Sequence, residues 1–289
     1  MAKPVSLRGN INKVPKLKEL NLIQQFGEGI QSASPLEYAK AGFSQEAEYY
    51  RDIVQKNNYV NLGRVIDLAG GFGRWAVFLA EVNDYVLCLD HHPGLIELCR
   101  RLAQYLEFDN IEGRVGSVMD LPVEDASFNA AWLHGAIFLV ERGKTMKEIA
   151  RILVPGGRLY MGACNGPGKM LQKLCRGYLE GGYDHHLCKQ AMAAFEHGPL
   201  FDGQPNYVTG DLLEEIMKRY GFTVEREYPV EDYRKNRLSP SEQKMLADHP
   251  SILTRFKADE GFRKFLLENY KRLMLGMEFD FWFSARKIK

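Results

Sequence analysis

The chain has 289 residues, and its 38 Lys and Arg against 37 Asp and Glu give a formal net charge of +1 at pH 7. This balance gives no electrostatic reason to expect a nucleic acid or an anionic membrane as partner. Hydrophobic residues make up 45% of the chain, yet no apolar run reaches the roughly 20 residues of a spanning helix. The first residues lack the apolar stretch of a secretory signal. We expect a cytoplasmic enzyme or binding protein.

The cysteines and histidines do not suggest a metal site. The five cysteines form neither a disulfide framework nor a CxxC zinc pattern, so we expect reduced thiols that pack as small hydrophobic side chains. Two histidine pairs occur, His91-His92 and His185-His186. Adjacent residues do not face one another on a helix, and no further ligand stands at a suitable spacing. We therefore expect no metal.

From Leu62 to Cys164, apolar runs rich in Val, Ile and Leu alternate with amphipathic stretches. This alternation is typical of an α/β fold with a doubly wound parallel sheet. Strands are expected at 64–68, 84–90, 111–116, 127–133, 158–164, 222–228 and 278–285. Helices are expected at 74–81, 93–106, 144–153 and 211–220. Pro155-Gly156-Gly157 should separate the third of these helices from the next strand, and Thr209 can cap the fourth.

Three segments lie outside this alternation. Residues 1–60 are expected to form a helical lid, with apolar residues at helical spacing from Leu36 to Ala47. Residues 165–208 and 231–276 are expected to be insertions in a sheet domain that spans 61–289. Open α/β sheets bind ligands at the carboxyl ends of their strands. We therefore expect all three segments to form a helical cap over those ends.

A glycine-rich turn, Gly70-Gly71-Phe72-Gly73, lies between the first strand and the first helix. Glycines let the chain turn sharply and bring backbone N–H groups close to a ligand. The helix that follows points its positive end at the same place. Asp90 ends the next strand, where a carboxylate can accept hydrogen bonds from ribose hydroxyls. An adenosine-containing cofactor is expected.

Two kinds of cofactor fit this turn. The residues from Gly71 to Ala76 spell a G-x-G-x-x-A string, which would suit the dinucleotide of a nicotinamide-dependent oxidoreductase. Asp67, just before the glycines, favours a different cofactor. Its carboxylate could accept a hydrogen bond from an amino group but would repel a pyrophosphate. The oxidoreductase is kept as an alternative.

Further motifs follow in chain order: Asp120-Leu121-Pro122, Ser127-Phe128-Asn129, Arg151 with Pro155-Gly156-Gly157, and Gly221-Phe222. With the glycine turn and its two acidic residues, they make residues 60–165 resemble the class I S-adenosylmethionine-dependent methyltransferases, in particular those that act on small molecules. The resemblance implies a Rossmann-like sheet of seven strands and S-adenosyl-L-methionine as the cofactor.

The resemblance also implies which residues contact the cofactor. An acidic residue and the glycines of the turn are expected to contact the methionine part: Asp67, Gly70, Gly71 and Gly73. The nucleoside falls to residues that follow the second and third strands: Asp90 for the ribose, His91 beside the adenine, and Ser117 and Val118 at its amino edge. Ala69 stands where the family has its first glycine, and a methyl group is tolerated there if φ is negative.

Methyl transfer from a sulfonium is an in-line displacement, so positioning of the reactants supplies much of the rate. A base is needed only if the acceptor arrives protonated. His134, after the fourth strand, is the best-placed residue for this role, although it could instead be hydrogen-bonded beneath the cofactor. Tyr38 is the tyrosine that we expect over the sulfonium. A cation–π contact there is worth about 1–2 kcal/mol.

The expected function is a methyltransferase that modifies an O, N or C atom of a small molecule, without nucleic acid or membrane as partner. A homodimer is left open. An enzyme of the same fold could instead use the sulfonium for cyclisation, elimination or aminocarboxypropyl transfer. A non-catalytic cofactor-binding protein is a further alternative, since binding does not imply turnover. The products separate the two chemistries, because methyl transfer leaves S-adenosylhomocysteine and attack elsewhere on the sulfonium leaves methylthioadenosine.

Overall fold

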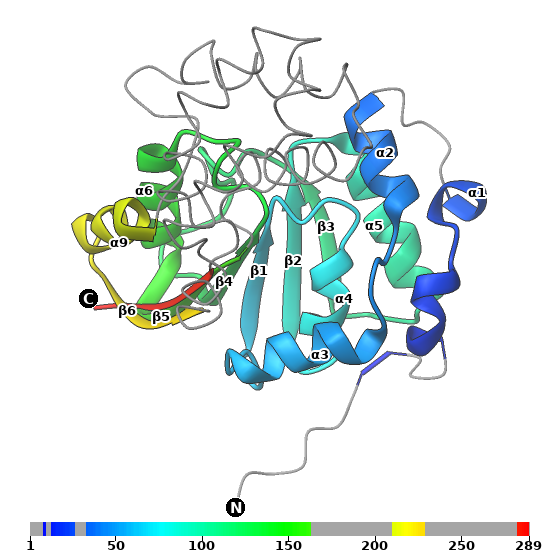
Figure 1. Cartoon of the computed structure of the whole chain (residues 1–289), viewed down its shortest axis with the longest axis horizontal. Helices are drawn as coiled ribbons and strands as arrows, with labels where there is room; N and C mark the ends of the chain where they lie inside the picture. The colour runs from blue at the N-terminus through cyan, green and yellow to red at the C-terminus, as the bar shows by residue number, and fades with distance from the viewer. Residues whose placement is uncertain (1–7, 10–12, 27–32, 163–209, 229–281, 289) are drawn as a thin grey trace, which may run out of the picture.

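The computed structural model describes residues 8–9, 13–26, 33–162, 210–228 and 282–288 (Figure 1). They form one seven-stranded sheet in the order β3-β2-β1-β4-β5-β7-β6. The strands are β1 (Arg64–Leu68), β2 (Tyr85–Asp90), β3 (Ile111–Val115), β4 (Phe128–His134), β5 (Leu153–Gly162), β6 (Phe222–Tyr228) and β7 (Trp282–Lys287). Strands β1 to β5 pair in parallel, and β7 is antiparallel to both β5 and β6. The expected α/β fold with seven strands is confirmed.

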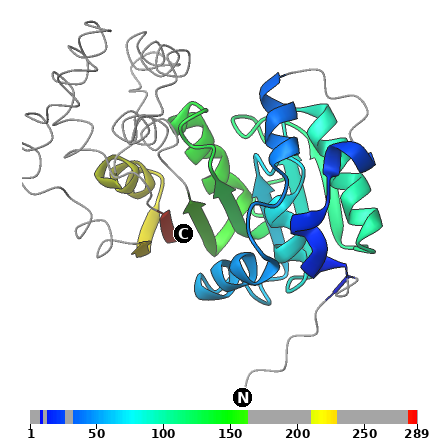
Figure 2. The same cartoon turned by 45° about the vertical axis from the view of Figure 1, so that its right-hand side comes forward.

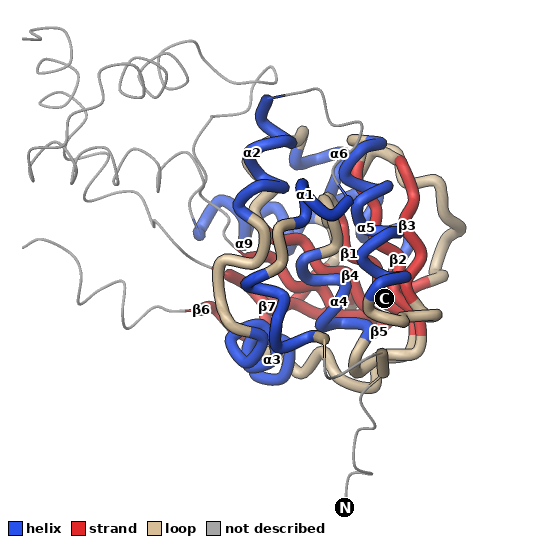
Figure 3. The backbone as a smooth tube through the Cα atoms, turned by 90° about the vertical axis from the view of Figure 1, so that its right-hand side faces the viewer, coloured by secondary structure: helices blue, strands red, loops and turns tan. Residues whose placement is uncertain are grey.

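Helices cover both faces of the sheet. They are η1 (Val14–Glu19), α1 (Leu22–Phe26), α2 (Ala33–Ala41), α3 (Ala47–Lys56), α4 (Arg74–Ala80), α5 (Pro93–Tyr105), α6 (Arg142–Ile152) and α9 (Gly210–Arg219). Because successive strand residues point to opposite faces, Val65 and Val86 pack with the layer of α3, α4 and α5. Ile66 and Leu87 pack with α6 and α9 on the other face. In Figure 3 the side of α1, α4 and α5 faces the viewer.

The first sixty residues are divided between the two ends of the sheet. Helix α2 lies at the carboxyl ends of the parallel strands, whereas α3 lies at the opposite end (Figures 1 and 2). In α3, Tyr50 stacks on Phe78 of α4 with ring centroids 4.7 Å apart. The apolar spacing from Leu36 to Ala47 spans two helices, because Gly42 follows α2 with a φ of +52°. Of the helices described in this segment, α2 is the one placed to border a site at the strand ends.

Helix α6 begins earlier than the expected start at Lys144. Its first residue is Arg142, and Glu141 is its N-cap. The carboxylate of Glu141 accepts hydrogen bonds from the N–H groups of Gly143, at 2.8 Å, and Lys144, at 3.0 Å. Side-chain acceptors at this position satisfy N–H groups that the helix leaves unpaired. The cap therefore sets the helix start.

Strand β5 also begins earlier than expected. It starts at Leu153 and runs through Pro155-Gly156-Gly157, which was expected to separate the helix from the strand. Gly156 has a φ of +77°, and the pairing of β4 with β5 shifts its register between Phe128 and Ala130. An irregular pairing of this kind lets a strand bend without ending. The expected break is wrong.

Several expectations concern residues outside the described part of the chain. These are the insertions at 165–208 and 231–276, the cap at Thr209, and the strand residues 163–164 and 278–281. Among the residues that are described, no helix combines the length and apolar character needed to cross a membrane.

Candidate functional site

A cavity of about 610 Å³ opens where β1, β2, β3 and β4 end and beside α2. Its lining includes all but one of the residues expected at the site: Tyr38, Asp67, Gly70, Gly71, Asp90, His91, Ser117, Val118 and His134. Gly73 is the exception. Pockets of this size suit a small molecule or cofactor. The fold thus brings together, at one edge of the sheet, residues that are far apart in the sequence.

The glycine turn places bare backbone against the cavity. The N–H of Gly71 donates to Oδ2 of Asp90 at 3.0 Å, which ties the turn to the end of β2. A Cβ on Gly71, whose φ is +59°, would lie 2.6 Å from Cε1 of Tyr38. A Cβ on Gly70 would lie 2.7 Å from Oδ2 of Asp67. Glycine is required at both positions because side chains already fill the space around them.

Ala69 corrects one expectation. Its φ is +52°, not negative, so an alanine holds the left-handed conformation that this position requires. That conformation costs an L-residue about 1–2 kcal/mol. The chain has to turn sharply here, because the N–H of the next residue, Gly70, bonds to the carbonyl of Leu89 at 3.0 Å. The strain accompanies the turn that brings the glycines to the cavity.

Gly73 has a packing explanation. It is the N-cap of α4 with a φ of +85°, and a Cβ there would lie 2.7 Å from Sγ of Cys99 in α5. Glycine thus permits the left-handed φ and the close approach of the two helices. Cys88 and Cys99 are buried free thiols beneath the turn.

Asp67 presents a buried acceptor to the cavity. It is 1% exposed, and the backbone N–H of Ala76 hydrogen-bonds its carboxylate. Its Oδ2 has no hydrogen-bond partner among the described residues. Burial, and to a lesser extent the charge of Asp90, raises the pKa of Asp67 to about 8. A buried polar atom without a partner is costly, so this oxygen fits a ligand that brings a hydrogen-bond donor.

Asp90 is held in place by backbone donors. Its Oδ2 accepts the N–H of Gly71, and its Oδ1 accepts the N–H of His92 at 2.9 Å. Nδ1 of His91 lies 3.4 Å from Oδ1, and the His91 side chain is 82% exposed. Each carboxylate oxygen can accept about two hydrogen bonds. One acceptor position on each oxygen is left for a diol.

The loop between β3 and β4 (residues 116–127, the β3–β4 loop) forms the side of the cavity next to Asp90. Oγ of Ser117 accepts the N–H of Met119 at 3.1 Å, and Val118 is 6% exposed. Gly116, Ser117, Val118 and Met119 all line the cavity. This side offers backbone groups and apolar contacts, as a flat heterocycle requires.

His134 and Tyr38 border the cavity from β4 and α2. The His134 ring centroid is 4.7 Å from that of Trp75, and a Cβ on Gly162 would lie 2.6 Å from its Nδ1. The Tyr38 ring lies 5.1 Å from that of Phe72. Burial raises the pKa of Tyr38 to about 12, although the charge of Arg74 opposes the rise. The Tyr38 hydroxyl is therefore neutral at neutral pH and is no general base there.

Comparisons with known proteins agree with this geometry. Residues 66–161 match the family model described as a methyltransferase domain. A demethylmenaquinone methyltransferase from Clavibacter sepedonicus is 35% identical over 97 residues, which are 33% of this chain and 39% of that protein. The O-methyltransferase rstn1 of Aspergillus nomiae is 28% identical over 180 residues, which are 60% of this chain and 70% of that protein. The (4+2)-cyclase SpnF shares the fold, with a TM-score of 0.52 and 18% identity over 84% of this chain and 82% of that chain.

Residues 66–161 thus match a methyltransferase domain, and this part of the chain resembles the class I S-adenosylmethionine-dependent methyltransferases. The family model matches the part of the sheet that carries the glycine turn and Asp90. The chain spans only 39% of the length of the Clavibacter relative. The cofactor of the family is S-adenosylmethionine. The orphaned Oδ2 of Asp67 and the diol acceptor at Asp90 fit that cofactor's ammonium group and ribose.

Sequence reasoning missed several residues that line the cavity: Pro35, Arg74, Trp75, Leu95, Met119, Ala136, Leu139 and Val140. Arg74 could have been found, since it follows the glycine turn directly. Its guanidinium lies 4.8 Å over the Tyr38 ring, and its Nη2 donates to the carbonyl of Gly42 at 2.5 Å. Arg74 thus links α2 and the chain after it to the turn. The other residues are ordinary apolar side chains without a motif.

Among the described residues, no group of three or more His, Cys, Asp or Glu side chains is arranged so that it could hold a metal ion. The pair His185-His186 and three of the cysteines, Cys164, Cys175 and Cys188, lie outside the described residues.

Proposed function

We propose that this chain transfers the methyl group of S-adenosylmethionine to an O, N or C atom of a small molecule. The observation that carries the proposal is the pair of buried carboxylates in one cavity. Asp67 offers an acceptor without a partner, and Asp90, fixed by backbone donors, has acceptor positions left for a diol. The match of residues 66–161 to the methyltransferase domain model supports the same chemistry.

In this proposal each end of the cofactor has its own residues. Asp67 accepts the ammonium group, and Arg74, which lines the cavity, faces the carboxylate. Gly70 and Gly71 let the turn pass close to Asp67 and Tyr38, which are the side chains proposed to contact the methionine part. Asp90 binds the ribose hydroxyls, while His91 lies beside the adenine and Ser117 and Val118 meet its amino edge. Gly73 contributes indirectly, by setting the course of α4.

When bound, S-adenosylmethionine supplies a methyl group activated by the positive sulfur. The chain's own residues orient the acceptor and exclude water. His134 accepts the acceptor's proton where one has to leave, since it ends β4 and lines the cavity. Tyr38 covers the methionine part with its ring, and we propose that α2 acts as a lid through this residue. The lid is proposed for α2 and not for α3, which lies at the opposite end of the sheet. The cap over 165–208 and 231–276 is part of the proposal.

The names of two relatives, demethylmenaquinone methyltransferase and O-methyltransferase, support a small molecule as the acceptor. The net charge of +1 gives no reason to expect a nucleic acid. Buried free thiols at Cys88 and Cys99 support a location in the cytoplasm.

A binding and product experiment tests the proposal. Titration calorimetry should show that the wild-type chain binds S-adenosylhomocysteine and does not bind NAD. Incubation with S-adenosylmethionine and a panel of phenols, quinols and amines should yield S-adenosylhomocysteine and a product heavier by one methylene unit. Methylthioadenosine as the only nucleoside product would contradict methyl transfer and favour cyclisation, elimination or aminocarboxypropyl transfer. Binding of NAD without binding of S-adenosylhomocysteine would overturn the cofactor assignment.

A further inference from the structure

The β3–β4 loop needs an external support. Four of its residues line the cavity, yet the β-bridge in this part of the structure joins only Ser117 and Asp120. Ala126 and Ser127, at the far end of the loop, donate their N–H groups to the carbonyls of Arg151 and Ile152 at 2.9 Å. Fixing the backbone of each residue costs about 1–2 kcal/mol of conformational entropy. A loop that has to keep its shape for a ligand must therefore be held by other parts of the chain.

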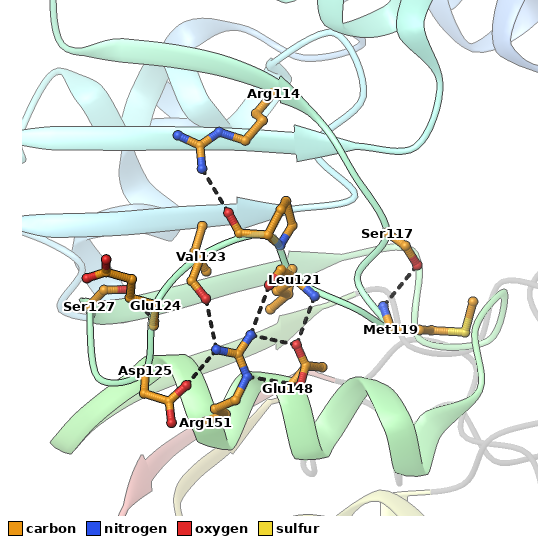
Figure 4. Close-up of polar contacts among 11 residues, drawn as sticks. Arg114, Ser117, Met119, Leu121, Val123, Glu124, Asp125, Ser127, Glu148 and Arg151 are labelled. Atoms are coloured by element: carbon orange, nitrogen blue, oxygen red, sulfur yellow. Dashed lines mark hydrogen bonds and ion pairs between the residues drawn. The ribbon is translucent and has the colours of Figure 1, made fainter.

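The support comes from the last turn of α6 (Figure 4). Nη1 of Arg151 donates to the carbonyl of Val123 at 2.8 Å and to Oδ1 of Asp125 at 2.7 Å. Its Nη2 donates to the carbonyl of Leu121 at 2.9 Å. The planar guanidinium thus contacts three residues of the loop at once. Lysine, with its single ammonium, cannot reproduce this fork.

Glu148, one turn earlier in α6, completes the arrangement. Its Oε1 accepts Nε of Arg151 at 3.0 Å, and its Oε2 accepts Nη2 at 2.7 Å. Oε2 also accepts the N–H of Leu121 at 2.8 Å. Leu121 is therefore held through both its N–H and its carbonyl. Arg151 and its hydrogen bond lower the pKa of Glu148, so the bonds are charge-assisted at neutral pH.

Packing carries this support to the cavity. Pro122 lies between Leu121 and Val123, the two residues whose carbonyls Arg151 binds. It also packs against the start of the loop, since a Cβ on Gly116 would lie 3.1 Å from Cγ of Pro122. The N–H of Gly116 donates to the backbone carbonyl of Asp90 at 2.9 Å. Sδ of Met119 accepts the N–H of Glu141, the N-cap of α6, at 3.4 Å. Both ends of α6 therefore fix the short stretch that lines the cavity.

We propose that Arg151 and Glu148 are positioning residues, which hold the β3–β4 loop in the shape that binds the nucleoside part of the cofactor. Neither side chain lines the cavity, so both act through the loop. The inference rests on the proposed function, and it assigns a role to the Arg151 motif that the reaction itself does not use.

Arg151→Gln and Arg100→Gln form a matched pair for the test. Arg100 also lies on a helix, pairs with a carboxylate and donates to a backbone carbonyl, that of Gly113 at 3.1 and 3.0 Å. Gly113 belongs to β3, which the sheet already holds. Calorimetry should show that Arg151→Gln weakens S-adenosylhomocysteine binding about tenfold, whereas Arg100→Gln stays within twofold of wild type. Hydrogen exchange should speed up at residues 117–120 in Arg151→Gln alone, with β1 and β2 unchanged.

Two further variants keep the inference testable if Arg151→Gln unfolds. Arg151→Lys retains the charge but not the fork, and it should lose affinity about threefold to fivefold. Glu148→Gln keeps one oxygen as a hydrogen-bond acceptor. It should show faster hydrogen exchange at residues 117–120 and a threefold to fivefold loss of S-adenosylhomocysteine affinity. Unchanged exchange and affinity within twofold of wild type in a folded variant would overturn the inference. If wild type bound no S-adenosylhomocysteine, the proposed function would fail, and the exchange comparison alone would still judge whether Arg151 holds the loop.

Discussion

The two sides of the cavity are built in different ways. The methionine side, from Asp67 to Gly73, depends on buried backbone, where left-handed residues and filled space leave no room for a side chain. The nucleoside side, the β3–β4 loop, depends on the polar clasp of Arg151 and Glu148, whose side chains are 27% and 15% exposed. One added atom on the methionine side creates a clash that lowers ligand affinity strongly. On the nucleoside side, each lost hydrogen bond of Arg151 or Glu148 lowers the affinity by a smaller amount. The two sides should therefore respond differently to substitution and to pH.

Gly71→Ala should have the largest effect. The added Cβ meets Tyr38 at 2.6 Å at a φ of +59°, and relief of that contact moves either the turn or Tyr38. Cofactor binding then has to reverse the shift, so we expect about a hundredfold loss of S-adenosylhomocysteine affinity, or roughly 3 kcal/mol. Calorimetry measures it.

Gly156→Ala is the control for this prediction. Gly156 also has a left-handed φ, of +77°, but a Cβ there meets nothing within 4 Å. This variant should lose about 1 kcal/mol of stability and no cofactor affinity. If Gly71→Ala bound as well as Gly156→Ala, the steric account of the methionine side would be wrong.

Asp67→Asn should have the next largest effect, and one that depends on pH. Burial raises the pKa of Asp67 to about 8 in the free protein, so the carboxyl is mostly protonated at pH 7. An ammonium donor favours the carboxylate, so binding expels this proton. Affinity in the wild type should rise by up to about tenfold per pH unit towards pH 8. In Asp67→Asn it should be about tenfold weaker at pH 8 and no longer follow this rise.

Tyr38 and Cys88, which interact with the charge of Asp67, do not titrate between pH 6 and pH 8. Burial raises the pKa of Tyr38 to about 12, and a hydrogen bond with Cys99 together with burial raises the pKa of Cys88. A raised folded pKa also means that the stabilisation by protonated Asp67 is complete below its ordinary pKa of 3.8 and lost as the pH rises through 8. Thermal denaturation of the free protein should therefore show a loss of stability between about pH 5 and pH 8, levelling off above pH 8, that Asp67→Asn lacks. A wild-type affinity that is flat from pH 6 to pH 8 would contradict the assignment of Asp67.

Ala69→Gly should have a smaller effect, and a stabilising one. Glycine adopts the φ of +52° without the cost that alanine bears. Part of the gain is offset by the greater freedom of glycine in the unfolded chain. We expect an increase of about 0.5–1 kcal/mol in the free energy of unfolding, measured with denaturant, and an affinity unchanged within twofold. A destabilised variant would show that Ala69 makes a contact that outweighs its strain.

The smallest expected effect is the contribution of Glu148 to stability at acid pH. The lowered pKa of Glu148 means that its stabilisation is present above its ordinary value of 4.5 and is lost as the pH falls below it. Wild type should therefore lose more stability than Glu148→Gln between pH 6 and pH 4, by less than about 1 kcal/mol because such pairs are partly solvated. Melting temperatures at several pH values check this. Equal losses would show that the clasp carries no charge-dependent stability.

The methionine side could be predicted from the sequence because its requirements are local. Glycines between a strand and a helix, with an acidic residue on either strand, are recognised by position alone, and the structure places Asp67, Gly71 and Asp90 around one cavity. The φ of Ala69 could not be predicted, since it follows from the bond that Gly70 makes to the neighbouring strand.

The nucleoside side was only partly predictable. Ser117 and Val118 were placed at the cavity through the family resemblance, and the structure lines the cavity with both. The function of Arg151 was not found, because its partners are backbone carbonyls that carry no sequence pattern. The division of the first sixty residues between the two ends of the sheet was missed for a similar reason. Helical spacing shows that a helix is amphipathic but not which surface it covers.

A crystal structure of the chain with S-adenosylhomocysteine tests the central claim most directly. The ammonium group of the ligand should lie within about 2.7–3.2 Å of Oδ2 of Asp67, and the ribose hydroxyls should lie at the same range from the Asp90 carboxylate. A ligand bound away from this cavity, or one that leaves both carboxylates without contact, would contradict it.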